Sequence, residues 1–434
     1  MRTDIVHIGA GELTYEIRNI VQVGDAIQAL GRSINWENIG DPIAKGEKLP
    51  QWMKDIVAEE VQKDSVYGYC PTKGVKTTRE FIAAEVNARG GARITSEDII
   101  FFNGLGDAIS KVFGMLKRTA RVVVPTPSYT THSSAEAAHA GHKPITYRLD
   151  PGNYWYPDLE DLENHIRYNP AVAGILIINP DNPTGAVYPE EILVRMVELA
   201  KKYDLFIICD EIYHNIIYNG QSTPSLSTII GDVPAIAMRG ISKEMPWPGS
   251  RCGWIEIYNQ DKDPVFARYV KSIDDAKMTE VCATTLPQTV MPKIVRHPEY
   301  PLFLQQRVAR FERCSNIAYE ILQDVKGVRV NRTNGAFYMS VVFEKNVLTH
   351  EKTLPIESVT VRALVERLVA EDGCALDKRF VLYLLGATGV CLVPLSSFAT
   401  DLQGFRVTLL ERDEGVFRRV FHTIAHAITS YLAS

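Results

Sequence analysis

Four short apolar runs, each followed at once by a polar cluster, most constrain the fold of this chain. They are of strand length and rich in valine and isoleucine, and they span Arg121–Val124, Gly174–Ile178, Leu205–Cys209 and Ala235–Met238. Uninterrupted runs of this kind are typical of parallel strands covered by helices on both faces. They predict a mostly parallel sheet in the middle of the chain.

Amphipathic segments alternate with these runs. Between Gly185 and Asp204 apolar residues recur at helical spacing after a Pro-Glu-Glu start. A second helix is expected over Thr78–Arg89, ending at the Gly90-Gly91 pair. Strands alternating with helices predict an α/β fold with a doubly wound core.

The pattern changes after Pro292 and predicts a smaller α+β unit. We expect helices over Phe303–Leu322 and Val416–Leu432, and strands within Gly335–Phe343 and Phe405–Leu410. The first sixty or so residues are expected to pack with this unit. The predicted organisation is therefore an N-terminal segment (1–63), a large domain (64–293) and a small domain (294–434).

Composition argues against several functional classes. The 434 residues, with 47 Lys and Arg against 52 Asp and Glu, give a net charge of −5 and no basic face for nucleic acid. We also expect no membrane partner, because no apolar run is long enough to span a bilayer, and no signal peptide. Seven scattered cysteines without a CxxC pair, and histidines without HExxH, predict a cytoplasmic protein without a disulfide framework or metal site.

Lys243 follows the run that ends at Met238, with Ser242 directly before it. In open α/β sheets, ligands bind beyond the carboxyl ends of the strands. A lysine amine there can form an imine with an aldehyde and can accept and return protons. Most lysines in such turns are solvated loop residues, and a Ser-Lys pair by itself is weak evidence.

Asp210 ends the run Leu205–Cys209, and Tyr213 follows three residues later. A partly desolvated aspartate needs a partner, and a protonated pyridine nitrogen is a suitable one. The alternatives are a metal ligand or a helix cap for Asp210, and a core tyrosine for Tyr213. The tyrosine could donate a hydrogen bond to a phenolic oxygen on the same ring.

Further polar groups follow other predicted strands. Asn182 lies in a strand-to-helix turn and offers an amide, while Arg251 offers a guanidinium that suits phosphate or forms a surface ion pair. The turn Asn103–Asp107 opens a helix whose free N–H groups can bind phosphate. Tyr129, after the run ending at Val124, could stack on a flat ring. Each signal is weak alone, but together they point to one site.

The order and spacing of these groups resemble the class I and II aminotransferases, which are fold type I pyridoxal phosphate enzymes of the aspartate and alanine aminotransferase kind. The most specific motifs are Asn-Pro-Asp-Asn-Pro-Thr-Gly (179–185), Asp-Glu-Ile-Tyr (210–213) and Ser-Lys (242–243) with Arg251 eight residues after the lysine. The resemblance extends from about Asn38 to Leu410.

The resemblance implies a role for each residue. Lys243 would carry the cofactor, Asp210 would pair with its ring nitrogen, and Tyr213 would act with them in catalysis. The remaining residues would hold the cofactor or substrate: Asn182 at the ring oxygen and substrate, Tyr129 against the ring, Leu105, Gly106, Ser242 and Arg251 at the phosphate, Tyr69 at the phosphate of a partner subunit, and Gly40 and Arg406 at the substrate carboxylate.

The resemblance also implies an architecture and an activity. The large domain would hold a mostly parallel sheet of seven strands between helices, and both chain ends would form the small α+β domain. The protein would be a homodimeric transaminase of EC 2.6.1 type. It would use pyridoxal 5'-phosphate to move an amino group between an L-amino acid and a 2-oxo acid by a ping-pong mechanism.

One departure and three rival functions accompany this interpretation. Gly240 stands where many relatives have a phosphate-binding serine, three residues before the lysine. A carbon–sulfur lyase or synthase would use the same fold and cofactor residues. A non-catalytic pyridoxal phosphate-binding regulator would need a basic segment that the residues before Asn38 do not supply. A nucleotide-binding dehydrogenase would need GxGxxG after a strand, which is absent.

Overall fold

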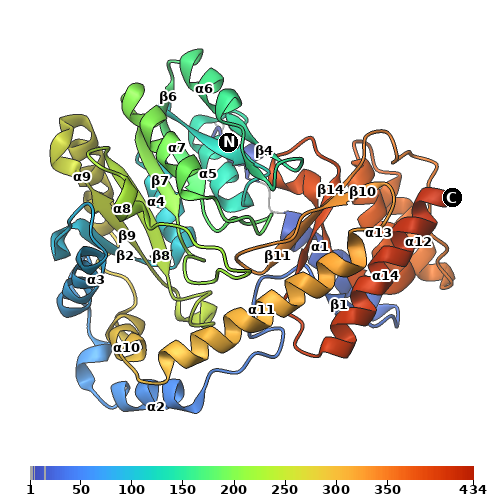
Figure 1. Cartoon of the computed structure of the whole chain (residues 1–434), viewed down its shortest axis with the longest axis horizontal. Coiled ribbons are helices and arrows are strands. Elements are labelled where there is room, and N and C mark those ends of the chain that lie inside the picture. Colours follow the sequence, from blue (N-terminus) through green and yellow to red (C-terminus); the bar gives the residue numbers. More distant parts are fainter. Residues whose placement is uncertain (1–2, 4, 14–15) are drawn as a thin grey trace.

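A twisted eight-stranded sheet forms the centre of the larger half of the molecule (Figure 1). The computed structural model describes residue 3, residues 5–13 and residues 16–434, with the side chains of 16–18 excepted. In spatial order the strands are β2 (Ile99–Asn103), β9 (Cys252–Tyr258), β8 (Ala235–Gly240), β7 (Phe206–Asp210), β6 (Val172–Ile178), β3 (Arg121–Thr126), β4 (Thr146–Asp150) and β5 (Tyr156–Pro157).

The strand directions confirm a mostly parallel sheet. Five neighbouring strands are parallel to one another: β8, β7, β6, β3 and β4. At the edges the pairs are antiparallel, namely β8 with β9, β9 with β2, and β4 with β5. The two-residue strand β5 is the addition to the seven strands expected. It returns directly after β4, which is why the pair is antiparallel.

Both faces of the large sheet are buried, which explains the uninterrupted apolar runs. Alternate residues of β7 point to opposite faces, with Ile207 in one core and Ile208 in the other. One face is covered by α4 (Leu105–Gly114), α5 (Thr130–Ala140) and α9 (Pro264–Met278). The other is covered by α3 (Lys76–Ala88), α6 (Leu159–Arg167), α7 (Glu190–Lys202), α8 (Leu226–Ile229) and α10 (Thr285–Val295).

The predicted helices have clear local causes. In α7, Leu193, Met196 and Ala200 form a buried stripe, and the helix has acidic residues in its first turn and lysines in its last. That arrangement of charge favours the helix dipole. Helix α3 ends one residue before Arg89, and Gly90 then takes a φ of 84°, which a residue with a side chain rarely adopts.

The small domain is built on a second, antiparallel sheet. Its strands, in spatial order, are β10 (Val328–Val330), β11 (Tyr338–Phe343), β14 (Gly404–Thr408) and β13 (Val393–Pro394). Its apolar core includes residues of α11 (Tyr300–Leu322), α12 (Val359–Val369), α13 (Leu376–Thr388) and α14 (Glu414–Ala433). The long helix α11 runs from the α10 side of the large domain to the small domain (Figure 1).

The N-terminal segment divides its contacts between the two domains. Helix α1 (Glu16–Ala29) places Ile20 and Ile27 in the small-domain core, and β1 (Asn35–Trp36) pairs with β12 (Val390–Cys391). Helix α2 (Gln51–Glu60) packs against α10 instead and buries Met53 in a large-domain core. The boundaries at 63 and 293 stay predictions.

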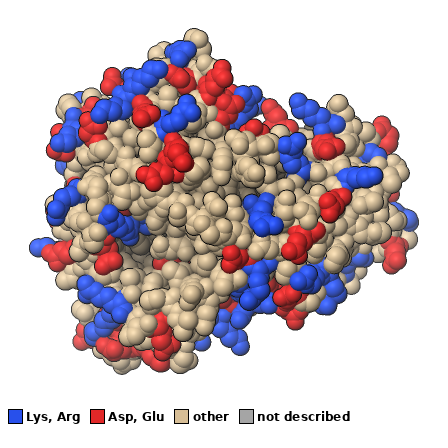
Figure 2. Space-filling view, in the orientation of Figure 1, with Lys and Arg blue, Asp and Glu red and all other residues tan. Residues whose placement is uncertain are grey.

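Short 3-10 helices connect these elements. They are η1 (Ala10–Glu12), η2 (Asp64–Tyr67), η3 (Ser96–Asp98), η4 (Pro248–Ser250), η5 (Gln260–Lys262) and η6 (Leu395–Phe398). On the face shown in Figure 2, side chains of both charges are mixed around the edge, and the middle is mostly uncharged. Among the helices of the described residues, none combines the length and apolarity needed to cross a membrane.

Candidate active site

Three adjacent parallel strands bring the predicted polar clusters to one edge of the large sheet. In the ladder, Ile178 of β6 lies beside Asp210 of β7, and Asp210 lies beside Met238 of β8. The segments that follow these strands carry Asn182, Tyr213 and Lys243, so the sheet register alone collects them. These residues and Asp210 are called the sheet-end group below.

Lys243 lies in the turn after β8, and its position is fixed from both ends. Its Nζ donates a hydrogen bond to the carbonyl oxygen of Gly40 at 2.7 Å. Its own carbonyl oxygen accepts from Nη1 of Arg307 at 3.0 Å, and the carbonyl of Glu244 accepts from the same atom at 2.6 Å. Arg307 is buried and pairs with Glu47, so α11 anchors the backbone of the lysine turn.

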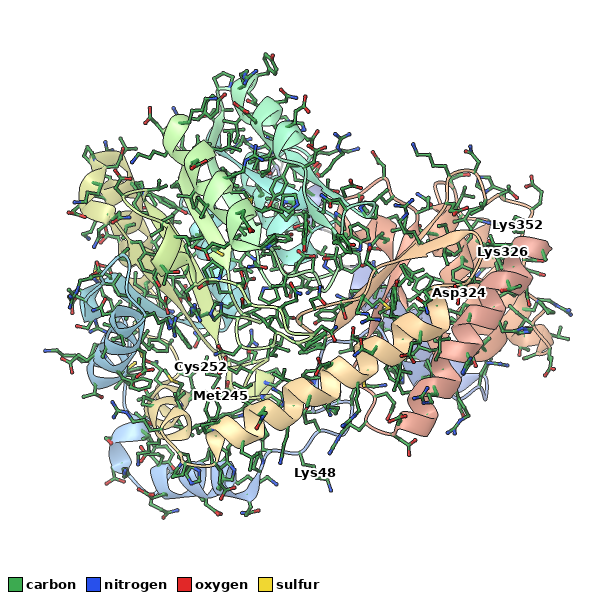
Figure 3. The ribbon with its side chains drawn as sticks, viewed as in Figure 1. Lys48, Met245, Cys252, Asp324, Lys326 and Lys352 are labelled. Carbon is green, nitrogen blue, oxygen red and sulfur yellow. The ribbon has the colours of Figure 1, made fainter. Side chains whose placement is uncertain are left out.

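The next residues secure this turn to the large domain. Met245 and Cys252, labelled in Figure 3, are buried in the core on the α3 side of the sheet. The turn therefore has an apolar anchor directly after the lysine. The backbone of the lysine turn is therefore held both by α11 and by the core of the large domain.

Asp210 is buried at the end of β7 and accepts two hydrogen bonds. Nε2 of His132 lies 2.9 Å from its Oδ2, and the backbone N–H of Ile212 donates to Oδ1 at 3.1 Å. His132 has no exposed surface, and among the described residues its Nδ1 has no hydrogen-bond partner. Sequence reasoning missed His132. The available signal was its position three residues after Tyr129, which directly precedes α5.

Tyr213 reaches from the sheet-end group to the small domain. Its hydroxyl donates to the hydroxyl of Tyr338 on β11 at 3.1 Å. Burial, with Tyr338 beside it, raises the pKa of Tyr213 well above its usual value. The phenol is therefore neutral at neutral pH and can act as a hydrogen-bond donor. Tyr338 was predicted only as part of a strand, and its role depends on partners distant in sequence.

Arg406 on β14 is buried and faces the same space. Its Nη1 donates to Oδ1 of Asn182 at 3.1 Å, and its Nη2 donates to the carbonyl oxygen of Asn38 at 2.6 Å. The guanidinium lies over the rings of Tyr338 and Phe398, at 4.5 Å and 5.0 Å from their centres. Arg406, Asn38, Gly40 and Tyr338 are called the small-domain group below.

Polar atoms without partners lie in this group. Within the described residues, Nε of Arg406 and both side-chain amide atoms of Asn38 are buried and make no hydrogen bond. Buried polar atoms in native proteins are usually paired, so unpaired ones around one space point to a polar ligand. A carboxylate is the ligand that best matches a buried guanidinium.

Gly40 has to be a glycine in this geometry. A Cβ atom built at this position would lie 1.9 Å from the hydroxyl oxygen of Tyr338. No side chain can be accommodated at that distance without moving Tyr338. The close approach allows the Gly40 carbonyl to meet the amine of Lys243.

A second group of predicted residues forms an anion cradle at the start of α4. Gly104 precedes the helix with a φ of 85°, and Leu105 and Gly106 are its first two residues. A Cβ at Gly104 would lie 2.5 Å from Nη2 of Arg251, so glycine permits the guanidinium to approach the turn. Free N–H groups at a helix start, together with a guanidinium, are suited to phosphate.

The surroundings of Gly240 leave little room for a side chain. Gly240 is the last residue of β8 and pairs with Gly253 of β9. A Cβ at Gly240 would meet the carbonyl oxygen of Cys252 at 3.0 Å, which is a tight contact. Ser242 is half-buried beside Lys243 and supplies a hydroxyl in the same turn.

Two other predicted residues occupy different settings. Tyr129 is half-buried at the start of α5, with its ring centre 6.1 Å from that of His132. Tyr69, between η2 and α3, is 87% exposed. Its contact with a second chain stays a prediction. In the described part of the chain, no cluster of three or more His, Cys, Asp or Glu side chains could hold a metal ion.

The arrangement brings together a lysine, a buried aspartate and a glycine turn with an arginine on one side, and a second arginine on the other. The family model for aminotransferase class I and II matches residues 35–422. An uncharacterized aminotransferase of Methanocaldococcus jannaschii is 58% identical over 432 residues, covering 100% of both chains. The glutamate-pyruvate aminotransferase AlaA of Escherichia coli is 30% identical over 329 residues, covering 75% of this chain and 79% of AlaA.

The fold is also similar to that of a solved aminotransferase structure. An aminotransferase from Escherichia coli superposes with a TM-score of 0.84 at 25% identity, covering 99% of each chain. The chain belongs to the aminotransferase class I and II family. It is therefore an enzyme, a transaminase of EC 2.6.1 type, and the predicted fold and family are confirmed.

Proposed function

We propose that this aminotransferase uses pyridoxal 5'-phosphate bound through Lys243. The observation that carries the proposal is the placement of Lys243, Asp210 and Tyr213 at the ends of neighbouring strands, opposite Arg406. The residues fit the cofactor. Asp210 and His132 suit a protonated ring nitrogen, Tyr213 can donate to the ring oxygen, and the cradle at Gly104 suits the phosphate.

The cofactor, when bound, supplies an electron-accepting ring that lowers the cost of removing a proton from the substrate Cα. The remaining steps belong to the chain. Once free, the Lys243 amine would act as a general base and remove the proton from the substrate Cα. As a general acid it would then donate a proton to the cofactor carbon. Asp210, held by His132, would offer its carboxylate to a protonated ring nitrogen, which would maintain the ring's electron demand.

Further residues bind and orient. Asn182 and Tyr213 would hold the ring oxygen, Tyr129 would stack on the ring, and the phosphate would be bound by Leu105, Gly106, Ser242 and Arg251. Arg406 would bind the substrate carboxylate in a bidentate pair, with Gly40 beside it. A single hydrogen bond at present joins Arg406 to Asn182, and a carboxylate would satisfy the unpaired Nε as well.

The substrates proposed are an L-amino acid and a 2-oxo acid, exchanged in two half-reactions. Among these we propose alanine, glutamate and pyruvate. The support is the names of relatives: the glutamate-pyruvate aminotransferase AlaA, and an alanine aminotransferase of Mycobacterium tuberculosis that is 29% identical over 332 residues.

A panel of single amino acids tests the substrate proposal. Each is mixed with cofactor-loaded enzyme, and the loss of absorbance of the lysine-bound cofactor is followed together with 2-oxo acid and ammonia. Alanine and glutamate should each yield one 2-oxo acid per site without ammonia. Release of ammonia in step with the 2-oxo acid would instead support the carbon–sulfur lyase alternative.

We also propose a homodimer in which Tyr69 reaches the phosphate of the partner's site. The support is its exposure beside a second exposed tyrosine, Tyr67, which is 74% exposed. Two large aromatic side chains that are two residues apart and both exposed are suited to a protein interface. A cytoplasmic location is proposed as well, supported by seven cysteines that are all free thiols.

A further inference from the structure

Two segments of the large domain, residues 68–75, which include Tyr69, and residues 282–288, are joined by hydrogen bonds. The Thr285 hydroxyl donates to the carbonyl oxygen of Gly68 at 2.8 Å. The Gln288 side chain accepts from the N–H of Val75 at 2.8 Å and donates to the carbonyl oxygen of Thr284 at 2.9 Å. These bonds hold the two segments at a fixed distance.

One cysteine lies on each of these segments. The Cys70 thiol donates to the carbonyl oxygen of Ala283 at 3.5 Å, and the Gln288 side chain donates to the Cys70 sulfur at 3.6 Å. Cys282 directly precedes Ala283, and its nearby thiol adds to the rise in the pKa of the Cys70 thiol that burial causes. Both residues are half-buried. By contrast, the thiols of Cys209, Cys252, Cys314 and Cys391 belong to buried residues.

The backbone is strained at Val281, the residue directly before Cys282. Val281 adopts a φ of 74°, which is unfavourable for a β-branched residue. The loop is held on both sides. The N–H of Val281 donates to Met278 at 3.2 Å, and Thr284 donates to the Asn103 side chain through its N–H at 3.1 Å and its hydroxyl at 3.0 Å. Strained residues that persist in this way cluster at functional sites.

We propose that Cys70 and Cys282 are a redox-active thiol pair, which a low-molecular-weight disulfide converts into an intrachain disulfide. In the first step the Cys282 thiolate attacks one sulfur of the small disulfide, and the other sulfur leaves as a thiolate that takes up the proton. In the second step the Cys70 thiolate attacks the Cys282 sulfur of the mixed disulfide and displaces the second small thiol. Two protein thiols are oxidised, and one small disulfide is reduced to two thiols.

The order of the two steps follows from the surroundings. Burial raises the pKa of the Cys70 thiol, so Cys70 is the poorer first nucleophile. In the mixed disulfide its target sulfur is held nearby, and the high local concentration compensates for the higher pKa. Cys70 is therefore the resolving thiol.

The disulfide would connect two parts of the candidate site. Cys70 is next to Tyr69, and the Cys282 loop is bonded through Thr284 to Asn103, which directly precedes the cradle at Gly104. Oxidation would therefore link residues 68–75, which include Tyr69, to the loop that is bonded to Asn103, next to the anion cradle. The thiol pair stands without the proposed function, whereas its effect on cofactor retention rests on the proposed function.

The cross-link is tested on the purified full-length protein, with and without cofactor, using oxidised glutathione. We expect a product lighter by two hydrogen atoms, and a non-reduced peptide map that joins the Cys70 and Cys282 peptides. Cys282→Ser should give no cross-link, whereas Cys374→Ser, which removes another half-buried thiol, should cross-link as the wild type does. The wild-type map suffices if a variant fails to fold.

Two results would overturn the proposal. They are a protein that stops at glutathione adducts, and a cross-link that joins other cysteines or two chains. The effect on the anion cradle is measured separately, as the rate at which pyridoxal phosphate is released and captured by an excess of a cofactor-free acceptor protein. Release should slow several-fold in the oxidised protein and recover after reduction. A mapped 70–282 disulfide with unchanged release would overturn the coupling and leave the thiol pair standing.

Discussion

The sheet-end group and the small-domain group meet across one space but are built in different ways. Lys243, Asp210 and Tyr213 follow neighbouring strands, and the register of a single sheet positions them. Arg406 instead contacts Asn38 from the N-terminal segment and Asn182 from the large domain. The first group is assembled by one sheet, although Lys243 and Tyr213 also bond to Gly40 and Tyr338, whereas the second group exists only where the two domains are in contact.

This difference predicts that the sheet-end group serves proton transfer and the small-domain group serves substrate binding. Groups fixed rigidly in one sheet suit proton transfer, which requires accurate placement of the reacting atoms. Groups on another domain suit substrate binding, because a bound carboxylate adds a contact between the domains. Substitutions in the sheet-end group should therefore lower kcat, and substitutions in the small-domain group should raise KM.

The largest effect is expected for Lys243→Ala. Loss of the base should lower kcat by about 10⁴-fold or more while the protein remains folded. Borohydride reduction of the cofactor-loaded wild type, followed by peptide mapping, should locate the cofactor on Lys243. The control is Lys48→Ala, an exposed lysine that points outward in Figure 3 and should keep full activity. Labelling of a different lysine would contradict the assignment.

Asp210→Asn should lower kcat by about 10³-fold, because the charge that favours a protonated ring nitrogen is removed from a buried site. Cofactor attachment to Lys243 should persist. The rate of exchange of the substrate Cα hydrogen in deuterium oxide measures the affected step directly. Asp324→Asn, at an exposed position, is the matched control. Wild-type exchange in Asp210→Asn would show that the aspartate has another role.

Arg406→Ala tests the other side of the comparison. Loss of a buried bidentate pair should raise KM by roughly 10- to 100-fold for every amino acid substrate, whatever its side chain. Arg406→Lys should restore binding only in part, since lysine has no planar fork. Steady-state kinetics with alanine, glutamate and an aromatic amino acid decide the point. A defect confined to acidic substrates would indicate that Arg406 contacts the side chain instead.

The sheet-end group could be predicted from the sequence because its cause is local. An apolar run followed by a polar residue shows where a strand ends, and parallel strands place their ends together, as with Asp210 and Lys243. The roles assigned to Gly40 and Arg406 came from resemblance alone. Their chemistry appears only when Tyr338 and Asn38, distant in sequence, are in contact with them.

Other features could not be predicted for the same physical reason. The one signal for His132 in the sequence is its spacing from Tyr129, and only the packing of α5 on the sheet places it 2.9 Å from Asp210. Helix α2 is short, and its preference for α10 over the small domain depends on the burial of Met53. Tertiary contacts determine both outcomes.

A smaller effect is expected at Tyr69, which belongs to neither group within one chain. Tyr69→Ala should weaken cofactor binding by roughly tenfold, as expected for one lost hydrogen bond to a charged group. At limiting cofactor, Lys243→Ala chains should be inactive, and Tyr69→Ala chains should retain only a small part of the wild-type activity. Subunit exchange should restore part of the activity, because one site of each heterodimer then has both native residues. A fully active monomer, or proven heterodimers without recovery, would contradict the shared site.

The smallest effect concerns Asp181, which lies in the loop after β6, one residue before Asn182. It has no exposed surface; its Oδ2 accepts from the N–H of Thr184 at 3.0 Å, and among the described residues its Oδ1 has no partner. Burial raises its pKa from 3.8 to about 7, and the nearby charge of Asp210 adds to the rise. The large-domain side of the site therefore contains a carboxyl group that is more easily kept protonated in the folded state.

The sign of the pH effect follows from that shift. Because the folded pKa is the higher one, the contribution of Asp181 to stability is complete below about pH 4 and is lost as the pH rises to about 7. Asp181→Asn removes this titration and keeps an oxygen that can accept from Thr184. The melting temperature of the variant relative to wild type should therefore rise by roughly 2–4 °C between pH 5 and pH 8. Asp324→Asn should show a constant difference over the same range, and a constant difference for Asp181→Asn would mean that its carboxyl group is already ionised at pH 5.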